Sequence, residues 1–222
     1  MTVSALLPDL VEISLRSLAV SGMAAIIAAL IGMPFGAWLA LTRFRGRRAA
    51  IAVLNALMGL PPVVVGLALY LLLSRSGPFG VLGLLYTPTA MIIAQVVIVT
   101  PLVASLAHQV LRDLWAEYHD LLLSLNARKG QRMRILLWDA RRALLTTGLA
   151  GFGRALGEVG AILIVGGNID HLTRVLTTAI TLETSKGNLA LAIGLGLILI
   201  AMSILVSLSV HLLSRTERAS RW

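Results

Sequence analysis

The sequence contains no cysteine, and charged and aromatic residues account for only 13% and 5% of its 222 positions. Without cysteine there can be no disulfide, no thiolate metal ligand and no thiol redox chemistry. The four histidines lack the spacing of a metal site, and the sequence has neither a nucleophile triad nor a Gly-x-x-x-x-Gly-Lys phosphate loop. The sequence therefore predicts no metal centre and no catalytic site of its own.

Hydrophobic residues dominate the composition instead. They make up 58% of the chain and give a mean hydropathy of +0.90, well outside the range of soluble globular proteins. A helix needs about 20 apolar residues to cross a bilayer, and open sheets or irregular loops cannot face lipid. We therefore expect a membrane protein built entirely from helices.

Five segments are long and apolar enough to span a membrane. They are residues 17–42, 49–74, 87–107, 143–166 and 189–213, and within them only Arg154 and Glu158 are formally charged. The segment Met1 to Glu12 lacks the basic start of a secretory signal peptide, so we expect the first span to be retained. The prediction is an all-α polytopic protein with five transmembrane helices in a single domain, residues 1–222.

Basic residues are distributed unevenly between the segments that join these spans. Most of the nineteen Lys and Arg residues follow the first, third and fifth spans, in residues 43–48, 112–142 and 215–221. The positive-inside rule then places the N-terminus outside and the C-terminus in the cytoplasm, in the cytoplasmic membrane. Membrane topology thus accounts for most of the net charge of +9. Because the charges are split among separate loops, nucleic acid is not an expected partner.

Prolines interrupt several of the predicted spans, most notably Pro61 and Pro62 in the second. Each proline removes an amide donor and disturbs the preceding turn. One interpretation is a bend or gate that lines a pathway. The other is ordinary packing, since proline and glycine are common in membrane helices.

The polar segment 112–142, between the third and fourth spans, is the most informative part of the chain. Leu121, Leu122 and Leu125 lie close to one face of a possible helix, and Asn126 tolerates the left-handed conformation that ends helices. Gln131 to Trp138 forms a second helical run. This pattern predicts helix, tight turn and helix on the cytoplasmic side. An amphipathic segment lying on the lipid headgroups would fit the composition as well.

The spacing within this segment resembles a loop found in permease subunits of ABC importers. That loop has an acidic residue followed by two small residues, a glycine six positions after the acid, and an aliphatic run beyond. Asp120 corresponds to the acid, Asn126 to the glycine, and residues 135–137 to the aliphatic run, whereas leucines replace the small pair and Trp138 stands near the usual proline. The resemblance implies a type I importer permease fold with a cytoplasmic coupling helix. The residues implied to couple to an ATPase are Asp120, Leu121, Leu122, Leu125, Asn126, Ala127 and Gly130.

A second resemblance covers the last two spans. Residues 151–169 resemble sulfate, molybdate and tungstate permeases, residues 173–187 look like the tungstate branch, and residues 60–66 are similar but less diagnostic. This implies a homodimer that works with two cytoplasmic ATPase subunits and an extracytoplasmic oxyanion-binding protein. It also implies that ATP acts only through the partner ATPase, and that the permease itself binds no cofactor. Molybdate or sulfate is the nearer alternative substrate, and a small helical channel or a membrane scaffold is the alternative from another class.

Arg154 and Glu158 are ionisable residues at membrane depth, where such groups are costly unless they are paired or hydrated. Their i, i+4 spacing allows them to pair on one helix face. We favour a structural ion pair. In the alternative interpretation, Arg154 faces the pathway and offers positive potential to an oxyanion.

Overall fold

The computed structural model describes residues 3–219, and every regular element in this part of the chain is helical. The elements in chain order are α1 (Val3–Leu41), α2 (Arg47–Met58), α3 (Pro62–Leu73), the 3₁₀ turn η1 (Gly80–Leu82), α4 (Pro88–Ser124), α5 (Lys129–Asp139), α6 (Arg141–Leu156), α7 (Gly160–Gly166), α8 (Leu176–Ser185) and α9 (Leu189–Ala219). The all-α class predicted from composition is confirmed.

Three helices are unbroken and apolar enough to cross a membrane, at Asp9–Leu41, Pro88–Ser124 and Leu189–Leu208. Two further candidates are bent pairs. Helices α2 and α3 meet at 96°, and α6 and α7 meet at 61°. Pro61 and Pro62 lie at the first bend, where Pro62 opens α3 and needs no amide partner within it. Counting each pair as one span gives five spans.

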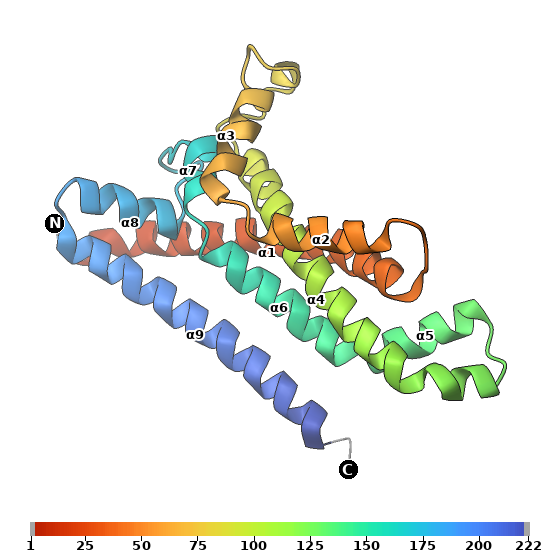
Figure 1. Ribbon diagram of the computed structural model, residues 1–222. Helices are drawn as coiled ribbons and strands as arrows, with labels where there is room; N and C mark the ends of the chain where they lie inside the picture. Colours follow the sequence, from red (N-terminus) through yellow and green to blue (C-terminus); the bar gives the residue numbers. More distant parts are fainter. Residues whose placement is uncertain (1–2, 220–222) are drawn as a thin grey trace.

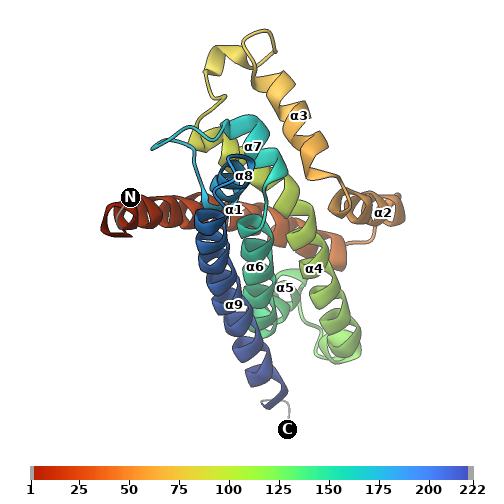
Figure 2. The ribbon, with the colours of Figure 1, turned by 90° about the vertical axis from the view of Figure 1, so that its left-hand side faces the viewer.

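The helices separate the loops into two ends (Figure 1). The N-terminus and the α7–α8 connection lie toward the left of Figure 1 and the α3–α4 connection lies at the top, whereas the α4–α5 hairpin lies at the lower right and α9 ends at the bottom. Figure 2 shows α9, α6 and α4 with roughly aligned axes, with α6 antiparallel to and between the other two and α1 crossing them. The arginine-rich segments 43–48 and 112–142 therefore belong to the end opposite the N-terminus.

Helices α1 and α4 form the most extensive interface and bring their backbones into close contact at Gly36. A Cβ atom at Gly36 would lie 2.4 Å from the Ala104 carbonyl oxygen and 2.9 Å from the His108 amide nitrogen. Small residues on the two helices, including Ala40, Ala104 and Ala107, are buried around this contact. Close approach of small residues is the usual way for helices to pack where no hydrophobic effect drives them together.

The structure modifies three expectations. The fourth span is bent rather than straight, and residues 113–124 continue α4 instead of forming a separate short helix. The helix α8 was not predicted, because its sequence is rich in threonine. In the structure, Thr178 satisfies the start of α8 by accepting from the Val175 amide at 3.1 Å. Local side-chain hydrogen bonds of this kind can initiate a helix that propensity alone would not predict.

The contact at Gly36 predicts that glycine-to-alanine substitutions at two positions of α1 will affect stability differently. Gly36→Ala forces a Cβ atom against fixed backbone and should destabilise the protein by about 1–3 kcal/mol. Gly22→Ala is the matched control, because its Cβ would meet only a Phe152 ring carbon at 4.0 Å. The control should leave stability unchanged or raise it slightly, since alanine has a higher helix propensity than glycine. Thermal unfolding of the two variants in detergent measures the difference, and equal melting temperatures would contradict this account of the interface.

Candidate functional site

The α4–α5 hairpin, residues 114–140, turns on Asn126. Asn126 has φ +49°, which confirms the left-handed conformation expected from the sequence. Its amide donates to the Leu123 carbonyl at 2.9 Å, and the Ala127 amide donates to the Leu122 carbonyl at 3.2 Å. These two bonds form a Schellman motif, which closes the end of α4 and reverses the chain. The residue type at position 126 therefore fixes the position of the turn.

Leu122 lies inside the hairpin and not on its outer surface. It is 3% exposed and belongs to a buried cluster with Leu114, Leu136 and Ala140. Ala127 packs partly against the same cluster. Leu122 and Ala127 therefore hold the two helices of the hairpin together, and a coupling role for either would act through the shape of the hairpin.

The other predicted coupling residues face outward. Leu121 is 54% exposed and Leu125 is 68% exposed. Trp138 on α5, which was not among the predicted coupling residues, is 70% exposed. The Asp120 carboxylate is fully exposed and contacts only the His119 ring, at 2.9 Å. A Cβ atom at Gly130 would meet open space, so the fold of this chain does not require glycine there. The hairpin thus exposes apolar side chains and a carboxylate on its outer surface.

Arg154 and Glu158 form an ion pair at the bend between α6 and α7. The Arg154 Nη1 atom lies 3.0 Å from Glu158 Oε2, and the Glu158 side chain is buried at 5% exposure, whereas that of Arg154 is 39% exposed. Glu158 Oε1 also accepts from the Ala161 amide at 3.4 Å, at the start of α7. The carboxylate therefore holds both the arginine and the helix start after the bend. The guanidinium retains a free side, and its role in a pathway stays a prediction.

Side chains from other helices donate to backbone carbonyls at this bend, where the Ala155 carbonyl also accepts from the Glu158 amide at 3.1 Å. The Gln95 amide on α4 donates to the Ala155 carbonyl at 2.9 Å, and the Thr177 hydroxyl on α8 donates to the Glu158 carbonyl at 3.0 Å. Unpaired carbonyls at membrane depth would cost several kcal/mol each. Gln95 and Thr177 therefore stabilise the break in the fourth span.

The two bent spans contact each other directly. A Cβ atom at Gly160, the first residue of α7, would lie 2.7 Å from the Val63 side chain on α3, and one at Gly66 would lie 2.7 Å from the Ala161 Cα atom. Val63 comes directly after Pro61 and Pro62, at the bend of the second span. A movement at either bend must therefore displace the other.

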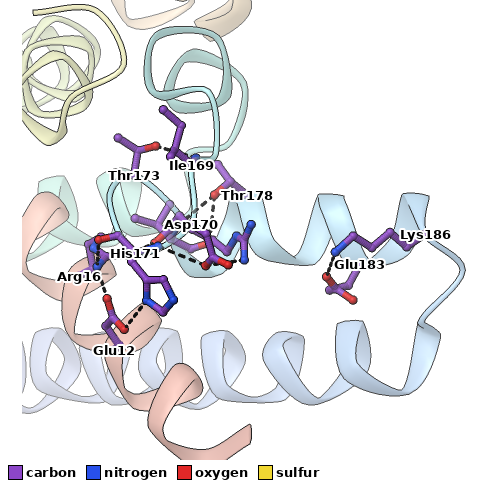
Figure 3. A network of polar contacts seen from close by, with 11 residues as sticks. Glu12, Arg16, Ile169, Asp170, His171, Thr173, Thr178, Glu183 and Lys186 are labelled. Atoms are coloured by element: carbon purple, nitrogen blue, oxygen red, sulfur yellow. Dashed lines mark hydrogen bonds and ion pairs between the residues drawn. The ribbon is translucent and has the colours of Figure 1, made fainter. Parts of the chain in front are cut away.

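A polar network joins α1 to the α7–α8 connection at the N-terminal end of the molecule (Figure 3). Arg16 contacts Glu12 and donates to the His171 carbonyl at 2.7 Å, while the His171 ring lies 3.0 Å from a Glu12 carboxylate oxygen. His171 has φ +53°, a conformation uncommon for a residue with a side chain. The Glu12 hydrogen bond, then the charges of Glu12, Asp170 and Asp9, raise the pKa of the exposed His171 above its usual value, against a smaller opposing effect of desolvation.

Sequence reasoning missed Gln95 and the network around His171. A signal existed for both. Gln95 is the one amide side chain in the predicted span 87–107, and Glu12 and Arg16, like Asp170 and Arg174, have the i, i+4 spacing that permits pairing. Within residues 3–219 no group of three or more metal-ligating side chains converges.

A structural ion pair and an Arg154 that faces the pathway predict different effects of substitution on stability. Arg154→Gln leaves a buried carboxylate unpaired and should lower the unfolding free energy by about 1–3 kcal/mol. The double variant Arg154→Gln/Glu158→Gln should recover much of the loss, because it removes the unpaired charge. Thermal unfolding of the single and double variants measures this, with Arg112→Gln, which breaks an exposed pair with Asp113, as control. A normal melting temperature for Arg154→Gln with loss of transport would instead assign Arg154 to the pathway.

The raised pKa of His171 predicts that the network loosens at alkaline pH. Its stabilising contribution is fully present below the ordinary histidine pKa near 6.5 and is lost as pH rises through the raised pKa. Because the chain has no cysteine, a single nitroxide label at Leu172→Cys reports on the loop. Its mobility should increase between pH 6 and pH 9, and His171→Gln should remove that dependence. A label at Val81→Cys, in the α3–α4 connection, is the control, and equal pH dependence at both sites would refute the prediction.

Comparison with known proteins agrees with the resemblance to importer permeases, and the agreement covers most of the chain. Residues 32–219 match the family model described as "Binding-protein-dependent transport system inner membrane component". The tungstate uptake system permease protein TupB of Peptoclostridium acidaminophilum is 39% identical over 204 residues, covering 92% of this chain and 90% of that protein. The sulfate transport system permease protein CysT of Salmonella typhimurium is 30% identical over 203 residues, covering 86% and 73%.

Among solved structures, the MetNI methionine ABC transporter in an inward-facing conformation has a chain with the same fold. The TM-score is 0.79 at 18% sequence identity, with 99% of each chain covered. This likeness confirms the predicted type I importer permease architecture. The family match, the relatives and the fold together show that the chain belongs to the binding-protein-dependent transport system inner membrane components, the permease subunits of ABC importers.

Proposed function

We propose that this chain is the transmembrane subunit of an ATP-driven importer that moves tungstate into the cell by alternating access. The observation that carries the proposal is the 39% identity to a tungstate uptake permease over 92% of the chain, against 30% to a sulfate permease. Molybdate and sulfate are the nearer alternatives. Because the binding protein is expected to select the anion in such systems, the permease sequence constrains the substrate only through its similarity.

The proposed assembly contains two copies of this chain, two cytoplasmic ATPase subunits and an extracytoplasmic binding protein. The N-terminus lies outside and the C-terminus in the cytoplasm, which brings the arginine-rich segments 43–48 and 112–142 to the cytoplasmic end. ATP is hydrolysed in the partner subunits. The α4–α5 hairpin is the part of this chain that they would contact.

Burial of the exposed leucines would supply enough binding free energy to hold the hairpin on the ATPase during coupling. Burying one leucine side chain contributes roughly 1.5–3 kcal/mol, and reversing a two-state population from 1:99 to 99:1 requires about 5.5 kcal/mol. Leu121 and Leu125 are both more than half exposed in the isolated chain. Their burial in each of two subunits would therefore hold the hairpin firmly enough to transmit the conformational change of the ATPase.

The helices offer a continuous route from the hairpin to the two bends. Helix α5 ends at Asp139 and α6 starts at Arg141, with only Ala140 between them, so a rotation of the hairpin would act directly on α6. Helix α6 is about 24 Å long and ends at the bend, where Gly160 touches Val63 of α3. Docking at one end of α6 would thus move both bent spans at the other.

A doubly charged oxyanion needs such a route, because hydrocarbon cannot replace its hydration. The half-exposed guanidinium of Arg154 supplies positive potential near the bend, and its pairing with Glu158 keeps that potential moderate. A weak site suits transport, since an anion that binds tightly along the path cannot leave it.

The hairpin model predicts that Leu121→Asp will abolish ATP-coupled uptake. An aspartate at this exposed position cannot be buried against a partner without a large desolvation cost, whereas the fold of the chain itself should tolerate it. Uptake of anion by reconstituted complex, together with membrane insertion, measures the effect.

The matched control is Leu123→Asp, which places the same charge on the same helix at a 43% exposed residue outside the predicted contact stripe. Leu123→Asp should retain most of the uptake. Normal uptake by Leu121→Asp would rule out a docked hairpin at this residue.

The proposed function is tested by ATP hydrolysis in liposomes that contain this chain and its ATPase. The binding protein is added with tungstate, molybdate or sulfate bound. Stimulation by the tungstate-loaded form alone would support both coupling and substrate, and stimulation by another anion would transfer the proposal to that substrate. A channel or scaffold would form no stable complex and give no stimulation with any anion.

A further inference from the structure

A stack of three aromatic rings lies at the end of α1, beside the connection to α2. The Trp38 ring stacks on that of Phe35 at a centroid distance of 5.8 Å and on that of Phe44 at 4.8 Å. Helix α1 ends at Leu41, so the chain turns back after the helix and places Phe44 against it. All three rings are exposed on the surface of the chain. None of the roles described above uses them.

The stack continues an apolar stripe that runs along α1 toward the middle of the membrane. Ile31, Phe35 and Trp38 are spaced at i, i+4 and i+7, so they share one face of the helix, and each is exposed. Trp38 precedes the predicted end of the first span, at residue 42, by roughly 6 Å along the helix axis. Tryptophan is enriched at this depth, where acyl chains meet headgroups. The stripe therefore leads from the acyl chains to the headgroup layer.

The connection from α1 to α2 is rich in arginine. Four of the residues 43–48 are arginines, and two of them flank Phe44 in the chain. Arg47 serves the fold, because its Nε atom donates to the Leu39 carbonyl at 2.8 Å. The other three are exposed and have no ion pair within the described residues; they are Arg43, Arg45 and Arg48.

Acidic residues are scarce around these arginines. The sequence contains no Asp or Glu between Glu12 and Asp113, and Asp113 pairs with Arg112 at 2.9 Å. In Figure 1 the α1–α2 connection lies at the right, on the same side of the molecule as the α4–α5 hairpin and away from the N-terminus. The positive charge of this connection therefore favours an anionic partner.

We propose that the aromatic stack and its neighbouring arginines, Arg43, Arg45 and Arg48, form a binding site for one anionic phospholipid. The lipid phosphate accepts hydrogen bonds from the arginines, whose guanidinium groups match the geometry of phosphate. One acyl chain lies against the exposed stripe of α1. Basic clusters directly beyond the cytoplasmic end of a membrane helix attract anionic headgroups. The orientation proposed above puts the site in the inner leaflet, and only this choice of leaflet rests on the proposed function.

Other partners match the site less well. A zwitterionic lipid brings an ammonium group that the arginines repel. A free anion would meet the arginines but leave the aromatic stack uncovered. An acidic segment of the ATPase could reach the arginines, but covering the stack would take its backbone to a depth where unpaired peptide groups are costly. A second copy of this chain would shield Trp38 from lipid altogether.

Quenching of Trp38 fluorescence by brominated lipids tests the site in a bilayer. The chain has four tryptophans, and replacing Trp115, Trp138 and Trp222 with Phe leaves Trp38 as the only one. The full chain is reconstituted in mixtures of phosphatidylcholine and phosphatidylglycerol, one of which carries brominated acyl chains. Phosphatidylglycerol should bind beside Trp38 roughly fivefold more strongly than phosphatidylcholine, the ratio that one arginine near a membrane surface supports.

The double variant Arg43→Gln/Arg45→Gln removes two cations and leaves the aromatic rings in place. It should reduce the preference for phosphatidylglycerol to below about twofold. Brominated phosphatidylcholine should still quench Trp38, which verifies that this face has kept its structure. Arg75→Gln is the matched control, because Arg75 is an exposed arginine in the α3–α4 connection. The control should keep the full preference.

Native mass spectrometry of the permease–ATPase complex tests the same site in the assembled transporter. The complex is extracted in mild detergent from membranes of known lipid composition. Wild type and Arg75→Gln should retain phosphatidylglycerol in excess of its share of the membrane, and Arg43→Gln/Arg45→Gln should lose that excess.

Three results would overturn the proposal. The first is equal quenching of Trp38 by the two brominated lipids, which would make this face an ordinary lipid contact. The second is no quenching by either lipid, which would assign the stack to a second copy of the chain. The third is an equal loss of preference in Arg75→Gln, which would assign the preference to net charge. The bilayer measurements need neither ATP nor tungstate, so their failure is distinct from a failure of the proposed function.

Discussion

A chain that breaks its helices inside a membrane must satisfy the freed backbone groups with its own side chains, and the rest of this structure depends on that constraint. At the break between α6 and α7, Gln95 and Thr177 donate from neighbouring helices to the carbonyls of Ala155 and Glu158, and the Glu158 carboxylate accepts from the Ala161 amide near the start of α7. The bend is therefore fixed by α4 and α8, not by α6 itself. The second break, at Pro61, is packed against the first, so the two bent spans behave as one unit.

This unit is consistent with the proposed role of the chain as the membrane subunit of an ATP-driven importer. The α4–α5 hairpin is rigid inside, because the Schellman turn at Asn126 and the buried Leu122 fix its shape, and it is apolar outside. Helix α6 leads from that hairpin to the bends without an intervening loop. In the proposed mechanism, a movement of the hairpin would reach the middle of the membrane through packed helices, which cannot deform continuously. The Arg154–Glu158 pair lies where that movement arrives.

Composition and periodicity were sufficient to predict the helical membrane class, and residue spacing predicted the turn at Asn126 and the pairing partner of Arg154. The bends could not be derived in the same way. Proline at position 61 signals a break but gives no angle. The break after Gly157 depends on Gln95, distant in sequence, which donates to the Ala155 carbonyl. Leu122 was assigned to an outer face because i, i+1 and i+4 positions cluster on a helix, but the direction of that face depends on where α5 packs. Long-range contacts decided each of these points.

Net transport against a gradient tests the central claim most directly. Liposomes containing this chain and its ATPase, with ATP inside and tungstate-loaded binding protein outside, report accumulation as metal content by mass spectrometry. The account predicts that lumenal tungstate rises above the external concentration with ATP and does not rise with a non-hydrolysable analogue. Equilibration to the external concentration with or without ATP would contradict it and would identify the chain as a passive channel.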